Sequence, residues 1–202
     1  ASIFVPPGLD WKTKLQIYTR RYERAEIDAI MKYWNNSSSI LEIGGGAGIL
    51  ASVIDTNLCP KKHLIYEPIE SNFNCIKKQK LLTTTEVSSE SNTNSLKFRI
   101  RERVFGSGFF SDGVDSLDTD EFIEVPTIKV NEVINQNFDV ILMDVEGYEE
   151  VLLPELASQT KSTIIFEYHL DKCQIKLSEL FKACPNYTFT HFQDCTFIGT
   201  PS

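Results

Sequence analysis

The sequence predicts an α/β sandwich built on a mostly parallel sheet that closes on an antiparallel hairpin. Apolar strands alternate with helical patterns along most of the chain, as expected when helices cover both faces of a sheet. The stretch 138–147 contains a near-continuous apolar run, which is typical of a strand buried on both faces of a parallel sheet, and 162–169 reads as another buried strand that ends in polar groups. The last segment contains two strands joined by Gln193-Asp194, so we expect a hairpin there.

Length and composition indicate one globular domain. The chain has 202 residues, of which 42% are hydrophobic and 24% are charged. We expect an N-terminal arm and helices in 1–36 and the main core in 37–202. The formal net charge of −8 argues against a nucleic-acid partner.

The cysteines and the apolar runs indicate the compartment of the protein and whether it spans a membrane. Five widely spaced cysteines without a C-x-x-C motif argue against a disulfide framework and a zinc knot. They predict a reducing compartment such as the cytoplasm. No apolar run approaches the ~20 residues of a membrane span. Because the first residue is not methionine, a processed protein and one domain of a longer polypeptide both fit the sequence.

Helices and strands are predicted to alternate through the first half of the chain. Apolar residues at helical spacing mark the helices, and short apolar stretches bounded by turn residues mark the strands. In order, we expect one or two amphipathic helices in 11–33, a strand at 39–43, a helix at 48–55, a strand at 62–67, a helix at 69–82 and a strand at 96–104. The stretch 83–95 is nearly all polar and is predicted to be a solvated insertion.

The second half continues the alternation after a long loop. The expected elements are a strand at 125–128, a helix at 129–135, a strand at 138–147, a helix at 148–157, a strand at 162–169, a helix at 171–183, and a hairpin of 187–192 with 195–199. Pro126 cannot donate to a ladder, so its strand is expected at an edge. The loop 106–124 contains Phe109, Phe110 and Phe122 and is predicted to be a functional flap.

The stretch 42–48 runs from a strand into a glycine-rich turn that suits a bound cofactor. Glycine tolerates the unusual dihedrals of such a turn and lets a ligand approach the main chain. The dinucleotide fingerprint G-x-G-x-x-G/A is satisfied by Gly46, Gly48 and Ala51. The acidic turn of S-adenosylmethionine (SAM) enzymes is satisfied by Glu42, Gly44, Gly46 and Gly48. We favour SAM, because the dinucleotide motif leaves Gly44 and Gly45 without a role; an ordinary glycine-rich loop is the third alternative.

The next strand ends in Glu67, and Pro68 directly after it stops the ladder. The interval from Gly48 to Glu67 is close to the ~20 residues after which a βαβ unit places an acidic residue on a ribose. Glu67 is therefore predicted to bind the ribose hydroxyls of a nucleoside ligand.

Polar side chains end nearly every long strand, where ligands of open α/β sheets bind. These strand ends carry Glu42, Glu67, Asp144, Glu146, Glu167 and His169. The acids Glu149, Glu150 and Glu155 are predicted to lie on a solvated helix face instead. A metal site is an alternative use of Asp144, Glu146, Glu167 and His169, because carboxylates and imidazole are metal ligands. Their spacing matches no recognised ligand motif.

The segment D-V-E-G-Y-E at 144–149 resembles the D-V-E-G-x-E signature of FkbM-type SAM-dependent methyltransferases. Further blocks of the family match in the same order: E-I-G-G-G-A-G at 42–48, Y-E-P at 66–68, V-P-T-I-K-V at 125–130 and I-F-E at 165–167. The resemblance covers residues 40–169. The chain departs from the family pattern at Val130-Asn131, where Leu-Asp is frequent, and in the polar insertion 83–95.

This resemblance implies a Rossmann-like class I methyltransferase sandwich with a mostly parallel seven-stranded sheet. It also implies SAM as methyl donor and an oxygen acceptor on a sugar or small metabolite. The prediction is thus a SAM-dependent O-methyltransferase acting on a hydroxyl of a sugar or glycan, for example a deoxyhexose. An NAD-dependent oxidoreductase and a noncatalytic domain that retains the fold are the alternatives.

The methionine end of SAM is expected against the turn 42–48, its ribose on Glu67, and its adenine near Glu102, Arg103 and Val104. The predicted cofactor-binding residues are Glu42, Gly44, Gly45, Gly46, Gly48, Glu67, Pro68, Arg103, Val104 and Asp144. The flap 106–124 is expected to cover the acceptor.

The catalytic candidates are Asp144, Glu146 and His169. A carboxylate beside a sulfonium stays ionised, so Asp144 is expected to place the donor. His169 titrates nearest neutrality and is expected to take the proton of the acceptor hydroxyl. No metal is required in this hypothesis. If a divalent cation is present, Asp144 and Glu146 are its first expected ligands, with Glu167 and His169 beside them.

Overall fold

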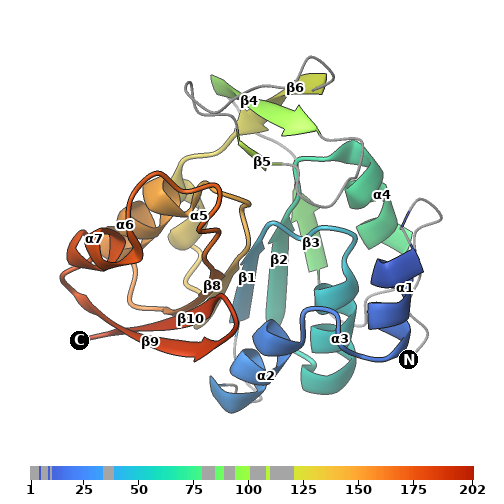
Figure 1. The fold of residues 1–202 in the computed structure, drawn as a ribbon, viewed down its shortest axis with the longest axis horizontal. Coiled ribbons are helices and arrows are strands. Elements are labelled where there is room, and N and C mark those ends of the chain that lie inside the picture. Colours follow the sequence, from blue (N-terminus) through green and yellow to red (C-terminus); the bar gives the residue numbers. More distant parts are fainter. Residues whose placement is uncertain are drawn as a thin grey trace.

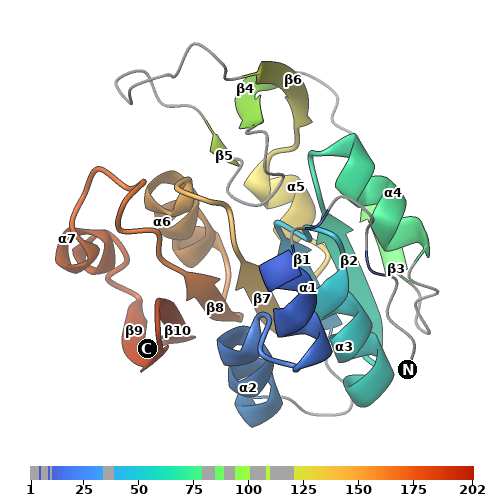
Figure 2. The same cartoon turned by 45° about the vertical axis from the view of Figure 1, so that its right-hand side comes forward.

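A computed structural model describes residues 5, 9, 11–33, 39–78, 85–88, 94–100, 108–109 and 121–202 of this chain. Within the strands 85–88, 94–100 and 108–109, and at 121–123 and 125–127, it describes the backbone only. Helices lie on both sides of a central sheet, and a smaller sheet lies at one end of it, beside α4 and α5 (Figures 1 and 2).

The central sheet has seven strands in the order β3-β2-β1-β7-β8-β10-β9. Its strands are β1 (Ser39–Ile43), β2 (Lys62–Tyr66), β3 (Thr85–Ser88), β7 (Val140–Met143), β8 (Thr163–Glu167), β9 (Tyr187–Gln193) and β10 (Thr196–Pro201). The pairs from β3 to β8 are parallel, and β10 is antiparallel to both of its neighbours. The predicted mostly parallel sheet with a C-terminal antiparallel hairpin is confirmed.

Side chains alternate between the two faces of this sheet, and each face is covered by its own helices. One face carries residues such as Ile40, Val140 and Ile165, which pack against α2 (Arg24–Tyr33) and α3 (Ile49–Leu58). The other carries Leu41, Ile141 and others, which pack against α5 (Val130–Ile134), α6 (Glu149–Gln159) and α7 (Leu177–Lys182). The strands β1, β7 and β8 are thus buried on both sides, as their apolar composition requires.

Two further helices complete the described part of the chain. α4 (Glu70–Lys78) packs Ile76 against Ile65 of β2. The N-terminal helices predicted in 11–33 are α1 (Trp11–Tyr18) and α2. Only α2 buries an apolar stripe; α1 leaves Trp11, Leu15 and Tyr18 exposed. No helix in the described ranges has the length and apolar character needed to cross a membrane.

The strand expected at 96–104 is present, but it does not belong to the central sheet. The strand at 96–104 is β4 (Asn94–Ile100), which belongs to a separate antiparallel sheet of order β5-β4-β6 with β5 (Gly108–Phe109) and β6 (Glu121–Thr127). Alternation in its sequence indicates a strand but not which sheet it joins. The central sheet instead takes β3 from within the stretch 83–95, predicted to be a solvated insertion. β3 is the last strand of this order, and the backbone hydrogen bonds that pair it with β2 do not require apolar side chains.

The segment predicted to be a flap contributes to the smaller sheet at both ends. Gly108 and Phe109 pair with Arg99 and Phe98, and β6 begins within it at Glu121. Residues 110–120 lie outside the described residues, as do 1–4 and 6–8 of the expected N-terminal arm. The edge position of the strand containing Pro126 is confirmed, because among the described strands β6 pairs with β4 alone.

Candidate functional site

The glycine turn joins β1 to α3 at the carboxyl edge of the central sheet. The N–H groups of Gly44 and Gly45 donate to the carbonyl oxygen of Tyr66, at 3.0 and 3.1 Å, so the turn is attached to the end of β2. Gly44 has a φ of 91°. A Cβ there would lie 1.7 Å from the carbonyl oxygen of Asp144, so only glycine fits. The turn therefore packs directly on the backbone that carries a predicted catalytic residue.

Glu67 connects the end of β2 to the same turn. Its Oε2 accepts from the Gly46 N–H at 2.8 Å and its Oε1 from the Ile69 N–H at 2.8 Å. Burial raises the pKa of Glu67 to about 7, although these hydrogen bonds oppose the rise. Space is open beside Gly46, where a Cβ would meet no atom within 4 Å. A ligand can thus approach the main chain here next to a carboxylate.

Beneath the turn lies a buried His63 that the sequence analysis missed. Its Nε2 lies 2.9 Å from Glu42 Oε2 and its Nδ1 lies 3.1 Å from Asp55 Oδ1. Burial alone lowers the pKa of His63, but the hydrogen bonds to Asp55 and Glu42 outweigh burial and raise it to about 9. A protonated ring donates to both carboxylates and so ties β1, β2 and α3 together. The only sign of this in the sequence is a histidine within an apolar strand.

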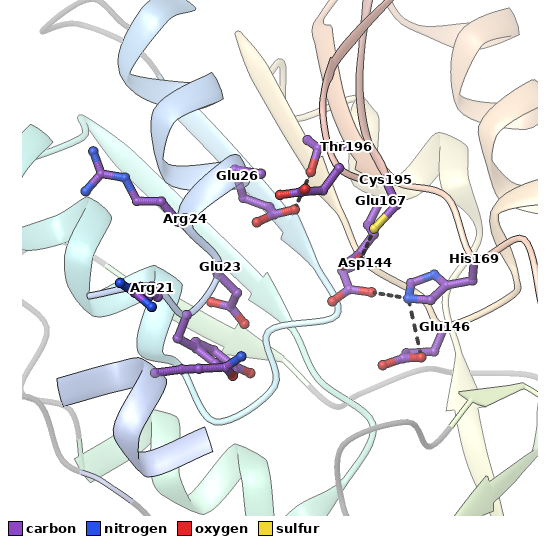
Figure 3. Close-up of a pocket in the computed structure, with 14 residues that line it drawn as sticks. Arg21, Glu23, Arg24, Glu26, Asp144, Glu146, Glu167, His169, Cys195 and Thr196 are labelled. Carbon is purple, nitrogen blue, oxygen red and sulfur yellow. Dashed lines mark hydrogen bonds and ion pairs between the residues drawn. The ribbon is translucent and has the colours of Figure 1, made fainter. Parts of the chain in front are cut away.

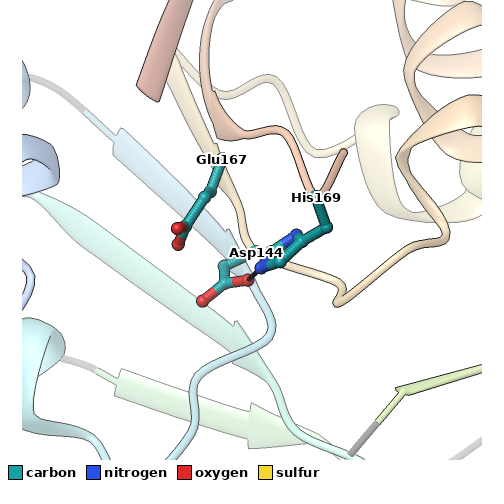
Figure 4. Close-up of side chains that lie close together, drawn as sticks. All are labelled: Asp144, Glu167 and His169. Carbon is teal, nitrogen blue, oxygen red and sulfur yellow. Dashed lines mark ion pairs between the residues drawn. The ribbon is translucent and has the colours of Figure 1, made fainter. Parts of the chain in front are cut away.

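Asp144 and Glu167 follow neighbouring parallel strands and are brought together by their register. Met143 of β7 pairs with Phe166 of β8, so the next residue on each strand projects at the same edge. His169 lies two residues beyond Glu167, and its Nε2 is 3.7 Å from Asp144 Oδ1. The three side chains converge (Figure 4), and one ligand atom from each lies within 4.8 Å of the other two. Three of the four residues named above as alternative metal ligands therefore lie together.

Glu149 is not on a solvated face, which corrects the prediction for this residue. It is fully buried at the start of α6 and its Oε1 lies 2.8 Å from His169 Nδ1. The N–H of Gly147 donates to both of its oxygens, at 3.0 and 3.2 Å. Glu150 also has partners, because it accepts from the N–H groups of Gln174 and Ile175. Glu155 is exposed as predicted.

Glu146 lies at the same site but has different partners. Its φ is 53°, a conformation that residues other than glycine adopt at a cost. It forms an ion pair with Lys172, and its Oε2 is 3.4 Å from His169 Nε2. Glu146 thus approaches the ring of His169 from the side of Lys172, while Asp144 approaches the same nitrogen from β7.

These residues border a cavity of about 300 Å³, and acids from the N-terminal region line its opposite side (Figure 3). Glu23 and Glu26 belong to the segment around the start of α2 and were not predicted as site residues. Thr196 donates to Glu26 at 2.6 Å, and the Sγ of Cys195 donates to Glu167 at 2.7 Å. The sequence gives no sign of these neighbours, because α2 is far from β8 along the chain.

The concentration of carboxylates shifts the protonation of the site. Burial raises the pKa of Asp144 to about 7, and the charge of Glu167 adds to the rise while His169 opposes it. Burial lowers the pKa of His169, but the hydrogen bond to Glu149 and the nearby carboxylates outweigh burial and raise it to about 9. Burial also raises the pKa of Glu23 well above its ordinary value. Among the described residues that line the cavity, six acids outnumber Arg21, Arg24 and His169, so the cavity favours a positively charged occupant.

The structure describes most of the predicted cofactor-binding residues. The turn residues and Glu67 meet at one edge, with Pro68 half-buried after Glu67. Arg103, Val104 and Glu102, near which the adenine was expected, lie outside the described residues. Glu42 lies below the turn and is bound to His63.

No protein-family model matches this sequence, and no curated protein matches it. Solved structures with similar folds include the magnesium protoporphyrin IX methyltransferase of Synechocystis PCC 6803 with bound SAM, at 9% identity and a TM-score of 0.54 over 100% of this chain and 87% of that one. A putative O-methyltransferase from Klebsiella pneumoniae has 11% identity and a TM-score of 0.51, over 99% and 92% of the chains. The N-methyltransferase NodS from Bradyrhizobium japonicum WM9 has 10% identity and a TM-score of 0.50, over 92% and 96%. At such identities the comparison establishes the fold, a Rossmann-like methyltransferase fold.

Proposed function

We propose that this chain is a SAM-dependent O-methyltransferase of the FkbM type, acting on a hydroxyl of a sugar or glycan such as a deoxyhexose. The observation that carries the proposal is the packing of the glycine-rich turn on the backbone of Asp144, beside the cluster of Asp144, Glu167 and His169. The methyltransferase fold and the D-V-E-G-Y-E segment support it. Fold relatives include both O- and N-methyltransferases, so the oxygen acceptor rests on the resemblance.

In this proposal SAM, the methyl donor, binds on the side of the glycine turn where space is open. The methionine end lies along Gly44–Gly48, where the space beside Gly46 is open. The ribose hydroxyls donate to Oε2 of Glu67, which accepts from Gly46 and keeps a second lone pair, whereas Oε1 already accepts from Ile69 and Asn72. Glu42, at the end of β1, is hydrogen-bonded to His63 and so helps to hold the strands that carry the turn. Arg103 and Val104, which lie outside the described residues, are proposed to bind the adenine.

SAM supplies a methyl group on a positively charged sulfur. The acceptor oxygen forms its bond to the methyl carbon as the carbon–sulfur bond breaks, and the bonding pair goes to sulfur. The hydroxyl proton must leave to a neighbouring group. Positioning lowers most of the barrier, and a base adds about 10²–10⁴-fold. Asp144, Glu146 and His169 are the residues proposed to act on this proton.

The charge of the cavity decides when His169 can accept a proton. With a pKa of about 9 its ring is protonated at neutral pH, because carboxylates surround it. A positive charge bound near Asp144 offsets these carboxylates and favours the neutral ring. We propose that the sulfonium has this effect, and that Asp144 stays ionised next to it.

SAM and NAD titrations on one purified sample, followed by transfer of labelled methyl from SAM to a panel of sugars and glycans, test the proposal. We expect SAM binding, no NAD binding, and label on a hydroxyl. We also expect His169→Ala to lower kcat with little change in SAM affinity. NAD binding would support an oxidoreductase, and binding of neither would support a noncatalytic domain.

We further propose that residues 1–202 form a single methyltransferase domain, with 1–36 as N-terminal arm and helices, that works in the cytoplasm without a nucleic-acid partner. All five cysteines are free thiols, which suits a reducing compartment.

A further inference from the structure

The cluster of Asp144, Glu167 and His169 has the dimensions of a cation site. One oxygen or nitrogen from each side chain lies within 4.8 Å of the other two (Figure 4). Opposite ligands of a divalent cation are about 4.2–4.6 Å apart, since each bond is about 2.1–2.3 Å long. Only one pair of the three atoms can be opposite ligands, and adjacent ligands at the same bond length are about 3.0–3.3 Å apart. Side-chain rotation must therefore bring the other atoms closer, by up to about 1.5 Å, for the site to form.

The imidazole of His169 is oriented from outside the cluster. Glu149 holds Nδ1 at 2.8 Å and is itself held by the Gly147 N–H, so the ring presents Nε2 to Asp144. Glu149 is fully buried. Metal-binding histidines usually have a carboxylate or carbonyl on the second nitrogen in this way. The buried Glu149 is thus an independent observation that points to a ligand on Nε2.

An oxygen of the cluster lacks a donor. Asp144 Oδ1 is inaccessible to solvent and has no hydrogen-bond partner among the described residues. A buried acceptor without a donor costs about 1–3 kcal/mol, and more when charged. This oxygen is the one 3.7 Å from His169 Nε2, so a cation between them would satisfy it.

Glu146, the other expected ligand, also approaches His169 Nε2, at 3.4 Å, but the same oxygen is already engaged by Lys172. It forms an ion pair with Lys172, which neutralises its charge. Glu167 has two oxygens, of which Cys195 donates to Oε1. The set that remains available to a cation is therefore two carboxylates and one imidazole.

We propose that Asp144, Glu167 and His169 bind one divalent cation of the Mn²⁺ and Mg²⁺ class. Two hard oxygens and one imidazole nitrogen suit Mn²⁺ best within this class. Three protein ligands leave about three of six coordination positions, which face the cavity of about 300 Å³.

Those open positions define the acceptor class, and this step rests on the proposed methyltransferase function. A molecule with two neighbouring hydroxyls can occupy two positions at once, which holds one oxygen in a fixed place beside the glycine turn. A cation also lowers the pKa of a hydroxyl bound to it. The acceptor is therefore a vicinal diol. With the cation bound, His169 is one of its ligands, and this replaces the role of base proposed for it above.

Titration of Mn²⁺ into the full chain, with free Mn²⁺ followed by electron paramagnetic resonance, tests the site without any need for turnover. We expect one bound Mn²⁺ per chain, and binding at least 10-fold weaker in Glu167→Gln and in His169→Gln. Glu132→Gln, an exposed acid on α5, removes the same charge and should bind Mn²⁺ like the parent. Circular dichroism establishes that each variant is folded. Equal affinities for the parent and both site variants would overturn the proposal.

The second arm separates this proposal from the proposed function. Calorimetric SAM binding should be the same with and without chelator, while methyl transfer to a vicinal diol should stop on chelation and return with Mn²⁺. Transfer that survives complete chelation overturns the cation site and leaves the methyltransferase. Mn²⁺ binding without SAM binding overturns the methyltransferase and leaves the cation site.

Discussion

Gly44 and Asp144 touch through their backbones: a Cβ on Gly44 would lie 1.7 Å from the carbonyl oxygen of Asp144. The turn after β1 and the residue after β7 are a hundred positions apart, yet neither can move without the other. Asp144 N–H also donates to Ile43 at 3.0 Å, which fixes the same junction. The proposed donor turn and the proposed catalytic cluster therefore form one rigid unit.

The first prediction concerns this junction. Gly44→Ala should lower the free energy of unfolding by about 3 kcal/mol or more, because it adds a backbone clash to a positive φ. Gly46→Ala is the matched control: its φ is also positive, but a Cβ there meets nothing within 4 Å, so about 1–2 kcal/mol is expected. Denaturant unfolding measures both. Equal losses for the two variants would contradict the close approach.

Most of the fold was predictable because its signals are local and strong. The continuous apolar runs of β7 and β8, and the hairpin around Asp194, each carry a pattern that no other structure explains as well. The strand β3 was not predictable. Its stability comes from pairing with β2, and its own residues, T-E-V-S, are nearly indistinguishable from the polar tract around them.

The candidate site was predictable only for residues at the carboxyl ends of the parallel strands, because their place in the sequence determines where they lie in the sheet. Asp144, Glu167 and His169 come together because parallel strands share one carboxyl edge. Glu149 and His63 are different, since each is a polar residue placed by partners remote in sequence. Nothing in an amphipathic helix start indicates that its first glutamate is buried under a histidine 20 residues later. Only the resemblance to the family signature D-V-E-G-x-E singles out Glu149, and the signature does not indicate that His169 is its partner.

The second prediction tests the ribose assignment. Glu67→Ala should weaken SAM binding by about 1.5–3 kcal/mol, roughly 10- to 150-fold in Kd, because it removes hydrogen bonds to a charged group. Glu70→Ala removes an exposed acid three residues later and should bind SAM like the parent. Calorimetry measures both. Undiminished affinity in Glu67→Ala would remove the assignment.

The third prediction concerns pH and His63. Its pKa rises from 6.5 to about 9 in the folded chain, so its protonated form stabilises the fold below pH 6.5. This contribution, on the order of 3 kcal/mol, is lost as pH rises through about 9, because the His63 ring between Glu42 and Asp55 then loses its proton and its positive charge.

Unfolding free energies at pH 6 and pH 9.5 measure this loss. The parent should lose more stability over this interval than His63→Gln, which is neutral at both values. His191→Gln changes an exposed histidine and should follow the parent. Identical pH dependence in the parent and His63→Gln would show that the buried ring is neutral throughout.

The last prediction separates a positioning role of Glu149 from a merely structural one. Glu149→Ala frees the Nδ1 of His169 from its 2.8 Å contact, so the ring can turn away from Asp144. Loss of such a partner usually weakens metal binding by about 10–100-fold, and we expect that loss for Mn²⁺. SAM affinity should not change, because Glu149 lies on α6 and does not contact the glycine turn. Glu149→Gln keeps an oxygen acceptor and should restore part of the Mn²⁺ affinity, while Glu155→Ala, exposed on the same helix, should have no effect. If Glu149→Ala lowers stability but binds Mn²⁺ as tightly as Glu155→Ala does, its buried carboxylate serves the fold and does not orient a ligand.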